Sequence, residues 1–102
     1  MPFYLYILRC ADGSYYVGHT DSLESRITAH EKGEIEGYTR KRRPVRLVFA
    51  QEFPSREQAF VLERQMKGWS RAKKEALIKR NWKRLQWLSR ARGSTGSPRA
   101  PL

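Results

Sequence analysis

The chain has 102 residues, with 21 Lys or Arg against 10 Asp or Glu and a formal net charge of +11. This length fits one domain of about 100–150 residues, and the longest apolar-rich run, residues 3–8, is far shorter than the ~20 residues that a transmembrane helix requires. Because the lone Cys10 excludes an intramolecular disulfide and a zinc cluster, and no signal-peptide pattern opens the chain, we expect a cytoplasmic protein.

The first predicted elements form a β-hairpin. Residues 3–8 are rich in aromatic and branched side chains and are too short for a helix, so they predict a buried strand. Asp12-Gly13 is a strong turn signal, and residues 14–18 resume the strand pattern.

A helix is predicted to follow the hairpin. Asp21 and Glu24 have the spacing of a capping box, which predicts a helix that begins there and runs to about Lys32. Leu23 and Ile27, four residues apart, should form its buried side.

The middle of the chain predicts a loop, a third strand and a second helix. Residues 33–43 are polar and end in a basic cluster, and residues 45–50 have the composition of a strand. Ser55, with Gln58 three residues later, is expected to cap a helix that Gly68 ends.

Ser70 is expected to cap a last helix, in which apolar residues recur at three- and four-residue spacing as far as Leu88. Residues 93–102 are rich in Gly, Ser and Pro, so we expect a disordered tail after a domain that spans residues 1–92. The order ββαβαα predicts an α/β fold with a small, three-stranded, mostly antiparallel sheet flanked by helices.

The positive charge is concentrated in the last third of the chain. Residues 1–63 hold nine basic and nine acidic side chains, whereas residues 64–102 hold twelve basic ones and a single acid, Glu75. Such asymmetry favours binding to nucleic acid, since Lys and Arg neutralise phosphates. The alternative is a solvated helix face or a basic tail that keeps the protein soluble.

Most catalytic motifs are absent from the sequence. It contains no phosphate-binding loop signature, no H-E-x-x-H and no Cys/His set with metal-ligand spacing. Tyrosines, arginines and carboxylates remain, and these suit phosphate-ester chemistry, because tyrosine relays a proton, arginine binds phosphate and a carboxylate holds Mg²⁺.

The spacing of these residues is characteristic. Two tripeptides, Tyr4-Leu5-Tyr6 and Tyr16-Val17-Gly18, are followed by Arg26, His30, the segment 43–48 and Glu63. With this pattern the sequence resembles the GIY-YIG nuclease family, and most of all its small single-domain bacterial members, over about residues 3–77. The resemblance implies a GIY-YIG-type sandwich fold and a metal-dependent endonuclease that hydrolyses DNA phosphodiester bonds.

The resemblance also implies roles for individual residues. Glu63 matches the carboxylate that holds one Mg²⁺ or Mn²⁺ ion, and Arg26 matches the arginine that stabilises charge on the phosphorane. Tyr6, Tyr16 and His30 match the groups that activate the attacking water, and the sequence leaves open which of them is the base.

We expect the remaining candidate residues to bind nucleic acid, with Tyr38-Thr39 lining the same cleft as the catalytic residues. The candidates are His19, Tyr38, Arg40, Lys41, Arg42, Arg43, Lys67, Lys73 and Lys74. The expected partner is DNA, selected by structure or strandedness, with single-stranded or branched DNA favoured. We expect a monomer with no membrane partner and no small-molecule cofactor.

Two departures from the family pattern leave a second function open. The first tripeptide lacks its glycine, and Glu75 stands where many relatives have an asparagine, the nearest asparagine being Asn81. The alternative is therefore a non-catalytic nucleic-acid-binding module with a degenerate nuclease site. A weaker one is a subunit that docks on a repair or ribosomal assembly through residues 73–92.

Overall fold

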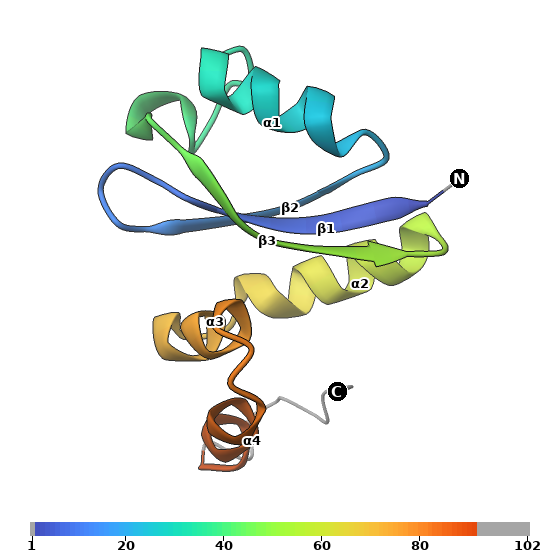
Figure 1. Cartoon of the computed structure of the whole chain (residues 1–102), viewed down its shortest axis with the longest axis vertical. Coiled ribbons are helices and arrows are strands. Elements are labelled where there is room, and N and C mark those ends of the chain that lie inside the picture. The colour runs from blue at the N-terminus through green and yellow to red at the C-terminus, as the bar shows by residue number, and fades with distance from the viewer. Residues whose placement is uncertain (1, 92–102) are drawn as a thin grey trace. The chain divides into compact units, whose positions relative to one another are not determined.

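The computed structural model describes residues 2–91, which form a three-stranded sheet and four α-helices (Figure 1). The elements in chain order are β1 (Phe3–Arg9), β2 (Tyr15–Thr20), α1 (Leu23–Lys32), the 3-10 helix η1 (Arg40–Arg42), β3 (Arg46–Phe53), α2 (Arg56–Lys67), α3 (Arg71–Ile78) and α4 (Trp82–Ala91). The chain divides into two compact units with the boundary between Lys67 and Gly68. The expected tail, residues 93–102, lies outside the described residues.

The predicted α/β fold is confirmed, with β1 at the centre of an antiparallel sheet of order β2-β1-β3. Helix α1 covers one face of this sheet and α2 covers the other (Figure 1). Residues Leu5, Tyr6, Ile7 and Leu8 of β1 are all buried, because successive side chains point to opposite faces and both faces are covered. The sheet therefore has two packed sides, and Tyr6 lies on the α1 side in a cluster with Leu8.

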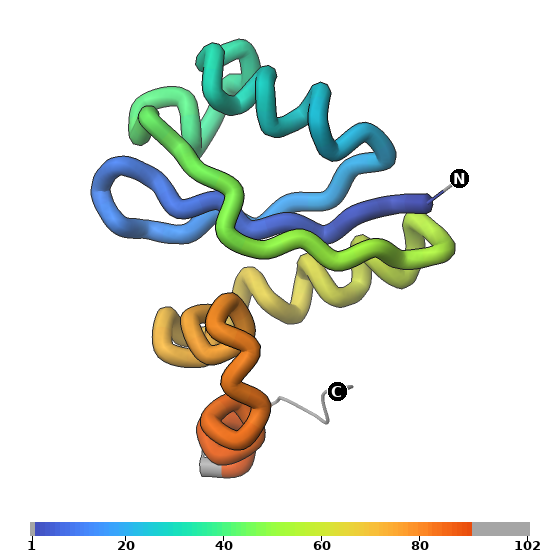
Figure 2. Tube along the Cα trace, viewed as in Figure 1, coloured from blue at the N-terminus to red at the C-terminus, as the bar shows by residue number. Residues whose placement is uncertain are grey.

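The predicted hairpin is present, and the loop before β3 lies against its turn. Asp12 accepts the Ser14 N–H at 3.0 Å inside the turn. The Ala11 N–H donates to the Arg42 carbonyl at 2.8 Å, so the hairpin turn and η1 lie side by side (Figure 2). Cys10, next to this contact, is a free and buried thiol whose pKa burial raises.

The predicted capping box at the start of α1 is wrong. Ser22, not Asp21, occupies the N-cap position, and no side chain caps the helix. The reason is that β2 continues to Thr20, whose Oγ1 accepts the Ser22 N–H at 3.0 Å and makes the turn into the helix. The predicted end is right: α1 stops at Lys32, and Gly33 follows with a left-handed φ of 75°.

Helix α2 begins and ends where the sequence predicts. The Gln58 N–H donates to Ser55 Oγ at 3.3 Å, and the helix stops at Lys67, one residue before Gly68. The strand before it, β3, is longer than the predicted 45–50, because its last residues pair with the start of β1 at Phe3.

The single C-terminal helix predicted after Ser70 is two helices in the structure. Ser70 does cap α3, but Arg80 has a positive φ of 55° and interrupts the helical path. Asn81 Oδ1 then accepts the Arg84 N–H at 3.1 Å and caps α4. No helix among residues 2–91 is long and apolar enough to cross a membrane.

Replacing the α2 cap tests this description of the helix. Ser55→Ala removes the acceptor for the Gln58 N–H and should lower the free energy of unfolding by about 1 kcal/mol. Ser55→Asp keeps an acceptor and should stay close to wild type. Urea denaturation at pH 7 measures both variants, and an equal loss in the two would contradict the capping role.

Candidate active site

The centre of the candidate site is a hydrogen bond between β1 and α1. Tyr6 Oη and His30 Nε2 are 3.0 Å apart, and the two side chains are only 2% and 1% exposed. On the other side of the imidazole, His30 Nδ1 lies 2.8 Å from Thr39 Oγ1, and Thr39 is 2% exposed. Both histidine nitrogens are therefore engaged inside the protein.

Tyr16 lies beside this pair on β2. Its ring centroid is 5.3 Å from that of His30 and 6.5 Å from that of Tyr6. The ring of Tyr38 stacks on Tyr16 at 6.1 Å. Three of the predicted catalytic residues and one predicted binding residue thus form a continuous aromatic cluster.

A glycine makes the approach of the strands possible. Gly18 pairs with Tyr6 across β1 and β2, and a Cβ at position 18 would fall 2.6 Å from Tyr6 Oη. No other residue fits there without moving the tyrosine, so the glycine of the second tripeptide has a steric role.

Charged groups around Tyr6 and His30 shift both pKa values. Burial raises the pKa of Tyr6 far above its usual range; Tyr16 and Glu63 add to the rise, and Arg26 opposes it. Burial and the positive charge of Arg26 lower the pKa of His30 below its usual 6.5. At neutral pH Tyr6 therefore keeps its proton and His30 is uncharged.

Glu63 lies on α2 and is 8% exposed. Its Oε1 forms a short hydrogen bond with His19 Nδ1, and its Oε2 is 3.0 Å from Lys67 Nζ. Lys67 also lies 5.5 Å from the ring centroid of Tyr16, and thereby links the carboxylate to the aromatic cluster. A buried carboxylate with two basic partners explains how this charge is tolerated between the helix and the sheet.

The residues around Glu63 fit a metal ion held by one carboxylate. Among residues 2–91, no group of three or more His, Cys, Asp or Glu side chains is placed to hold a metal. Mg²⁺ usually keeps several waters and takes only one or two protein carboxylates. The ammonium group of Lys67 already stands at one oxygen of Glu63, so this position attracts a cation.

Arg42, one of the predicted binding residues, makes three contacts within the protein. Its guanidinium lies 3.9 Å from the ring centroid of Tyr38, and its Nε is 3.1 Å from Asp12 Oδ2. Its Nη1 also donates to the Tyr38 carbonyl at 2.9 Å. Arg42 therefore fixes the loop that carries Tyr38 to the hairpin turn.

The other basic residues of this loop differ in their contacts. Arg43 Nε donates to the Arg40 carbonyl at 3.1 Å and Nη1 to the Glu31 carbonyl at 3.5 Å, which joins the loop to the end of α1. Arg40 pairs with Glu36 at 3.3 Å. Lys41 is exposed and has no ion pair among the described residues, which suits a side chain that meets a phosphate.

Lys73 and Lys74 belong to the second unit, on α3. The Lys73 ammonium lies 4.6 Å from the ring centroid of Trp69, and burial lowers the pKa of Lys74. The other predicted site residues all lie in the first unit, and the role of each of them, like that of these two lysines, stays a prediction.

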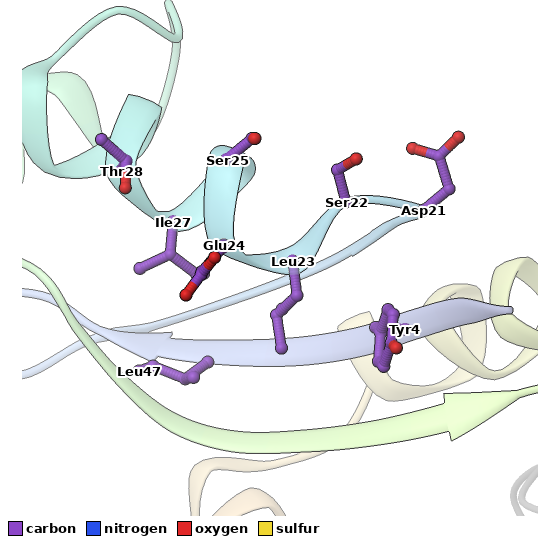
Figure 3. Close-up of a pocket in the computed structure, with 9 residues that line it drawn as sticks. All are labelled: Tyr4, Asp21, Ser22, Leu23, Glu24, Ser25, Ile27, Thr28 and Leu47. Carbon is purple, nitrogen blue, oxygen red and sulfur yellow. The ribbon is translucent and has the colours of Figure 1, made fainter.

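A groove of about 600 Å³ lies elsewhere on the first unit, between the start of α1 and the sheet. Figure 3 shows Leu23 and Ile27 above Tyr4 and Leu47, with Asp21 at the rim. Its lining includes two carboxylates and none of the predicted site residues, so it is unsuited to a phosphate group.

The sequence alone missed two parts of the site. Thr39 was expected only to line the cleft, but it hydrogen-bonds His30. The sequence did mark Gly18, since this residue ends the second tripeptide. Its close contact with Tyr6, however, becomes visible only with the pairing of β1 and β2.

A profile described as the GIY-YIG catalytic domain matches residues 2–76. The UPF0213 protein of Streptococcus pneumoniae serotype 4 is 42% identical over 78 residues, which are 76% of this chain and 79% of that protein. The UPF0213 protein BH0048 of Halalkalibacterium halodurans is 47% identical over 78 residues, or 76% of this chain and 83% of that protein.

Two solution NMR structures are similar to this chain. The UPF0213 protein BH0048 from Bacillus halodurans matches with a TM-score of 0.52 and 42% identity, over 94% of this chain and all of that one (100%). The protein EF2693 from E. faecalis matches with a TM-score of 0.53 and 31% identity, over 98% of this chain and 96% of that one.

Adding one methyl group at position 18 tests the packing at the centre of the site. Gly18→Ala should lower the free energy of unfolding by about 1–3 kcal/mol, because the Cβ would overlap the buried Tyr6 ring. Paired with Tyr6→Leu, the same change should cost less, since both overlapping atoms, Oη and Cζ, are gone. Chemical denaturation measures this double-mutant cycle, and strictly additive losses would contradict the contact.

The pKa of His30 is open to direct measurement. Protonation of His30 is disfavoured in the folded state, so the unfolded chain binds more protons and stability should fall as the pH drops below about 6.5. An NMR titration should give a His30 midpoint below 6.5. Arg26→Met should move that midpoint upward and Arg56→Met should not; equal midpoints in wild type and Arg26→Met would count against the effect of Arg26.

Proposed function

We propose that this chain, which belongs to the GIY-YIG nuclease family, is a metal-dependent endonuclease that hydrolyses phosphodiester bonds in DNA. The family match spans residues 2–76, so it includes both tripeptides and Glu63. The proposal also extends to selection of DNA by structure or strandedness, because one small module leaves little surface for reading base edges.

The observation that carries the proposal is the packing of the predicted catalytic residues into one cluster. Tyr6 of β1 is hydrogen-bonded to His30 of α1, and the Tyr16 ring of β2 lies 5.3 Å from that of His30 and 6.5 Å from that of Tyr6. Lys67 links this cluster to Glu63 on α2, since its ammonium lies 5.5 Å from the ring centroid of Tyr16 and 3.0 Å from Glu63 Oε2. A carboxylate, a cation and two phenols in this arrangement suit a reaction in which negative charge develops on a phosphate.

The roles follow from the chemistry of each group. Glu63 would hold one Mg²⁺ or Mn²⁺ ion, which supplies Lewis-acid stabilisation of the phosphate when bound. Arg26, exposed on α1, would bind a phosphate oxygen and offset the charge of the pentacoordinate state. Water activation falls to the cluster of Tyr6, Tyr16 and His30.

Several side chains would guide the DNA backbone toward this cluster. Lys67 is exposed and lies 5.5 Å from the ring centroid of Tyr16, and the exposed Lys41 follows Tyr38 closely in the sequence. The ring of Tyr38 is 40% exposed, so a base could stack on it. Binding through such contacts is salt-dependent and has little sequence preference.

One observation favours a second candidate, a non-catalytic nucleic-acid-binding module. Both oxygens of Glu63 already have basic partners, His19 and Lys67, so the carboxylate is satisfied without a metal. In that case the same surface would bind DNA without cleaving it.

Glu63→Gln distinguishes the two. We expect cleavage of labelled single-stranded, duplex or branched DNA in Mg²⁺ or Mn²⁺ to fall by about 100-fold or more, because several kcal/mol of metal-dependent stabilisation are lost. Glu57→Gln, an exposed carboxylate on the same helix, is the matched control and should cleave normally. All reactions are repeated with EDTA.

Equal cleavage by wild type and Glu63→Gln would overturn the catalytic role of Glu63. Tight DNA binding by the wild type without cleavage in either metal would support the binding module. Neither binding nor cleavage would contradict both functions.

A further inference from the structure

An exposed aromatic ring lies close to Glu63 on α2. Phe60 is 43% exposed, and its place three residues before Glu63 puts the two side chains on the same side of the helix. The ring centroid of Phe60 is 5.6 Å from that of His19, the residue of β2 that bonds the Glu63 carboxylate. A single side chain, that of His19, therefore connects Phe60 to the carboxylate proposed to hold the metal.

Basic residues continue the same side of α2. Arg64 and Lys67 follow Phe60 by four and seven residues, a spacing that keeps them on one side of the helix with Glu63. The Arg64 guanidinium is 5.7 Å from the ring centroid of Phe60, and Lys67 Nζ is 3.0 Å from Glu63 Oε2. Both cations are exposed, so this side of α2 presents an aromatic ring, a carboxylate and two positive charges.

At Lys67 this row of side chains meets the aromatic cluster. Lys67 Nζ lies 5.5 Å from the ring centroid of Tyr16, and the ring of Tyr38, itself 40% exposed, stacks on Tyr16 at 6.1 Å. A continuous series of side-chain contacts therefore joins two exposed rings, Phe60 and Tyr38, with the Glu63 carboxylate between them.

We propose that Phe60 is a base-stacking residue, which holds an unpaired base of single-stranded DNA next to the phosphate that faces Glu63. This inference deepens the proposed nuclease function and rests on it for the place of the phosphate. Helix residues three apart have Cβ atoms about 5–6 Å from each other, so the stacked base belongs to the nucleotide at that phosphate or to its neighbour.

The surroundings of the ring favour a base over an apolar protein segment. Phe60 lies beside the imidazole of His19 and the guanidinium of Arg64, and a nucleotide joins a flat apolar face to an anion that such groups attract. Val61 is 54% exposed, but consecutive helix residues do not face each other, so Phe60 and Val61 do not form one apolar patch.

Stacking on Phe60 would also distinguish single-stranded from duplex DNA. In a duplex each base is paired and stacked between its neighbours, so it reaches an aromatic side chain only after the free-energy cost of unpairing and unstacking. Every base has a π face, so the contact is tolerant of sequence. Phe60 would therefore select a strand by its lack of pairing and not by the identity of its bases.

Binding in EDTA tests the inference without cleavage. The probes are a dye-labelled single strand and the same strand with abasic sites, which keeps the phosphates and lacks the bases, and fluorescence anisotropy gives the Kd of each. Phe60→Ala should weaken binding of the normal strand about tenfold, as expected for one lost stacking contact, and should leave binding of the abasic strand within about twofold of wild type. Phe60→Trp keeps an aromatic ring and should bind the normal strand at least as tightly as the wild type.

Val61→Ala is the matched control, because Val61 is also an exposed apolar residue of α2. It should leave binding of both strands unchanged. Phe60 is exposed, so Phe60→Ala should keep the fold, and thermal denaturation of each variant checks this.

Equal affinity of the wild type and Phe60→Ala for the normal strand would overturn the inference. A loss of the same size on the abasic strand, or in Val61→Ala, would do so as well. If the wild type binds no DNA, the inference also fails and the ring is left for a protein partner. Binding that depends on Phe60 without cleavage in Mg²⁺ or Mn²⁺ would support the stacking and refute the nuclease function, whereas cleavage and binding that do not depend on Phe60 would do the reverse.

Discussion

The hydrogen bond between Tyr6 and His30 is the contact on which the rest of the site depends. It joins the central strand to α1 across 24 residues of sequence, and it is buried on both sides. Buried polar groups that are fully paired fix one arrangement of the elements around them, because any other arrangement would leave them unpaired. Gly18 allows this bond to form by leaving room for the tyrosine, and Thr39 completes it from the loop before β3.

Opposite charges act on this bond. Arg26 lowers the pKa of Tyr6 and Glu63 raises it, and Glu63 is in turn held by His19 and Lys67. These two basic partners keep the buried carboxylate paired, which offsets the cost of removing its charge from water.

Most of the fold follows from local signals in the sequence. The hairpin turn at Asp12, the cap at Ser55 and the end of α2 before Gly68 were all predicted, because each depends on residues within a few positions. The start of α1 and the break at Arg80 were missed, because β2 extends far enough for Thr20 to make the turn, and Asn81 caps a new helix. The spacing of the tripeptides and of Glu63 predicted the family, which the match over residues 2–76 confirms. It could not predict the contact between His30 and Thr39, which depends on the path of a loop.

That path is fixed by arginines that the sequence assigned to DNA. Arg42 joins the loop to Asp12 in the hairpin turn, and Arg43 joins it to the Glu31 carbonyl at the end of α1. The Thr39 carbonyl accepts the Arg42 N–H at 3.0 Å, which ties the residue whose hydroxyl meets His30 to the first of these arginines. The two arginines of this segment therefore serve the fold, because they fasten the loop that brings Thr39 to His30, whereas the exposed Lys41 before them makes no ion pair among the described residues.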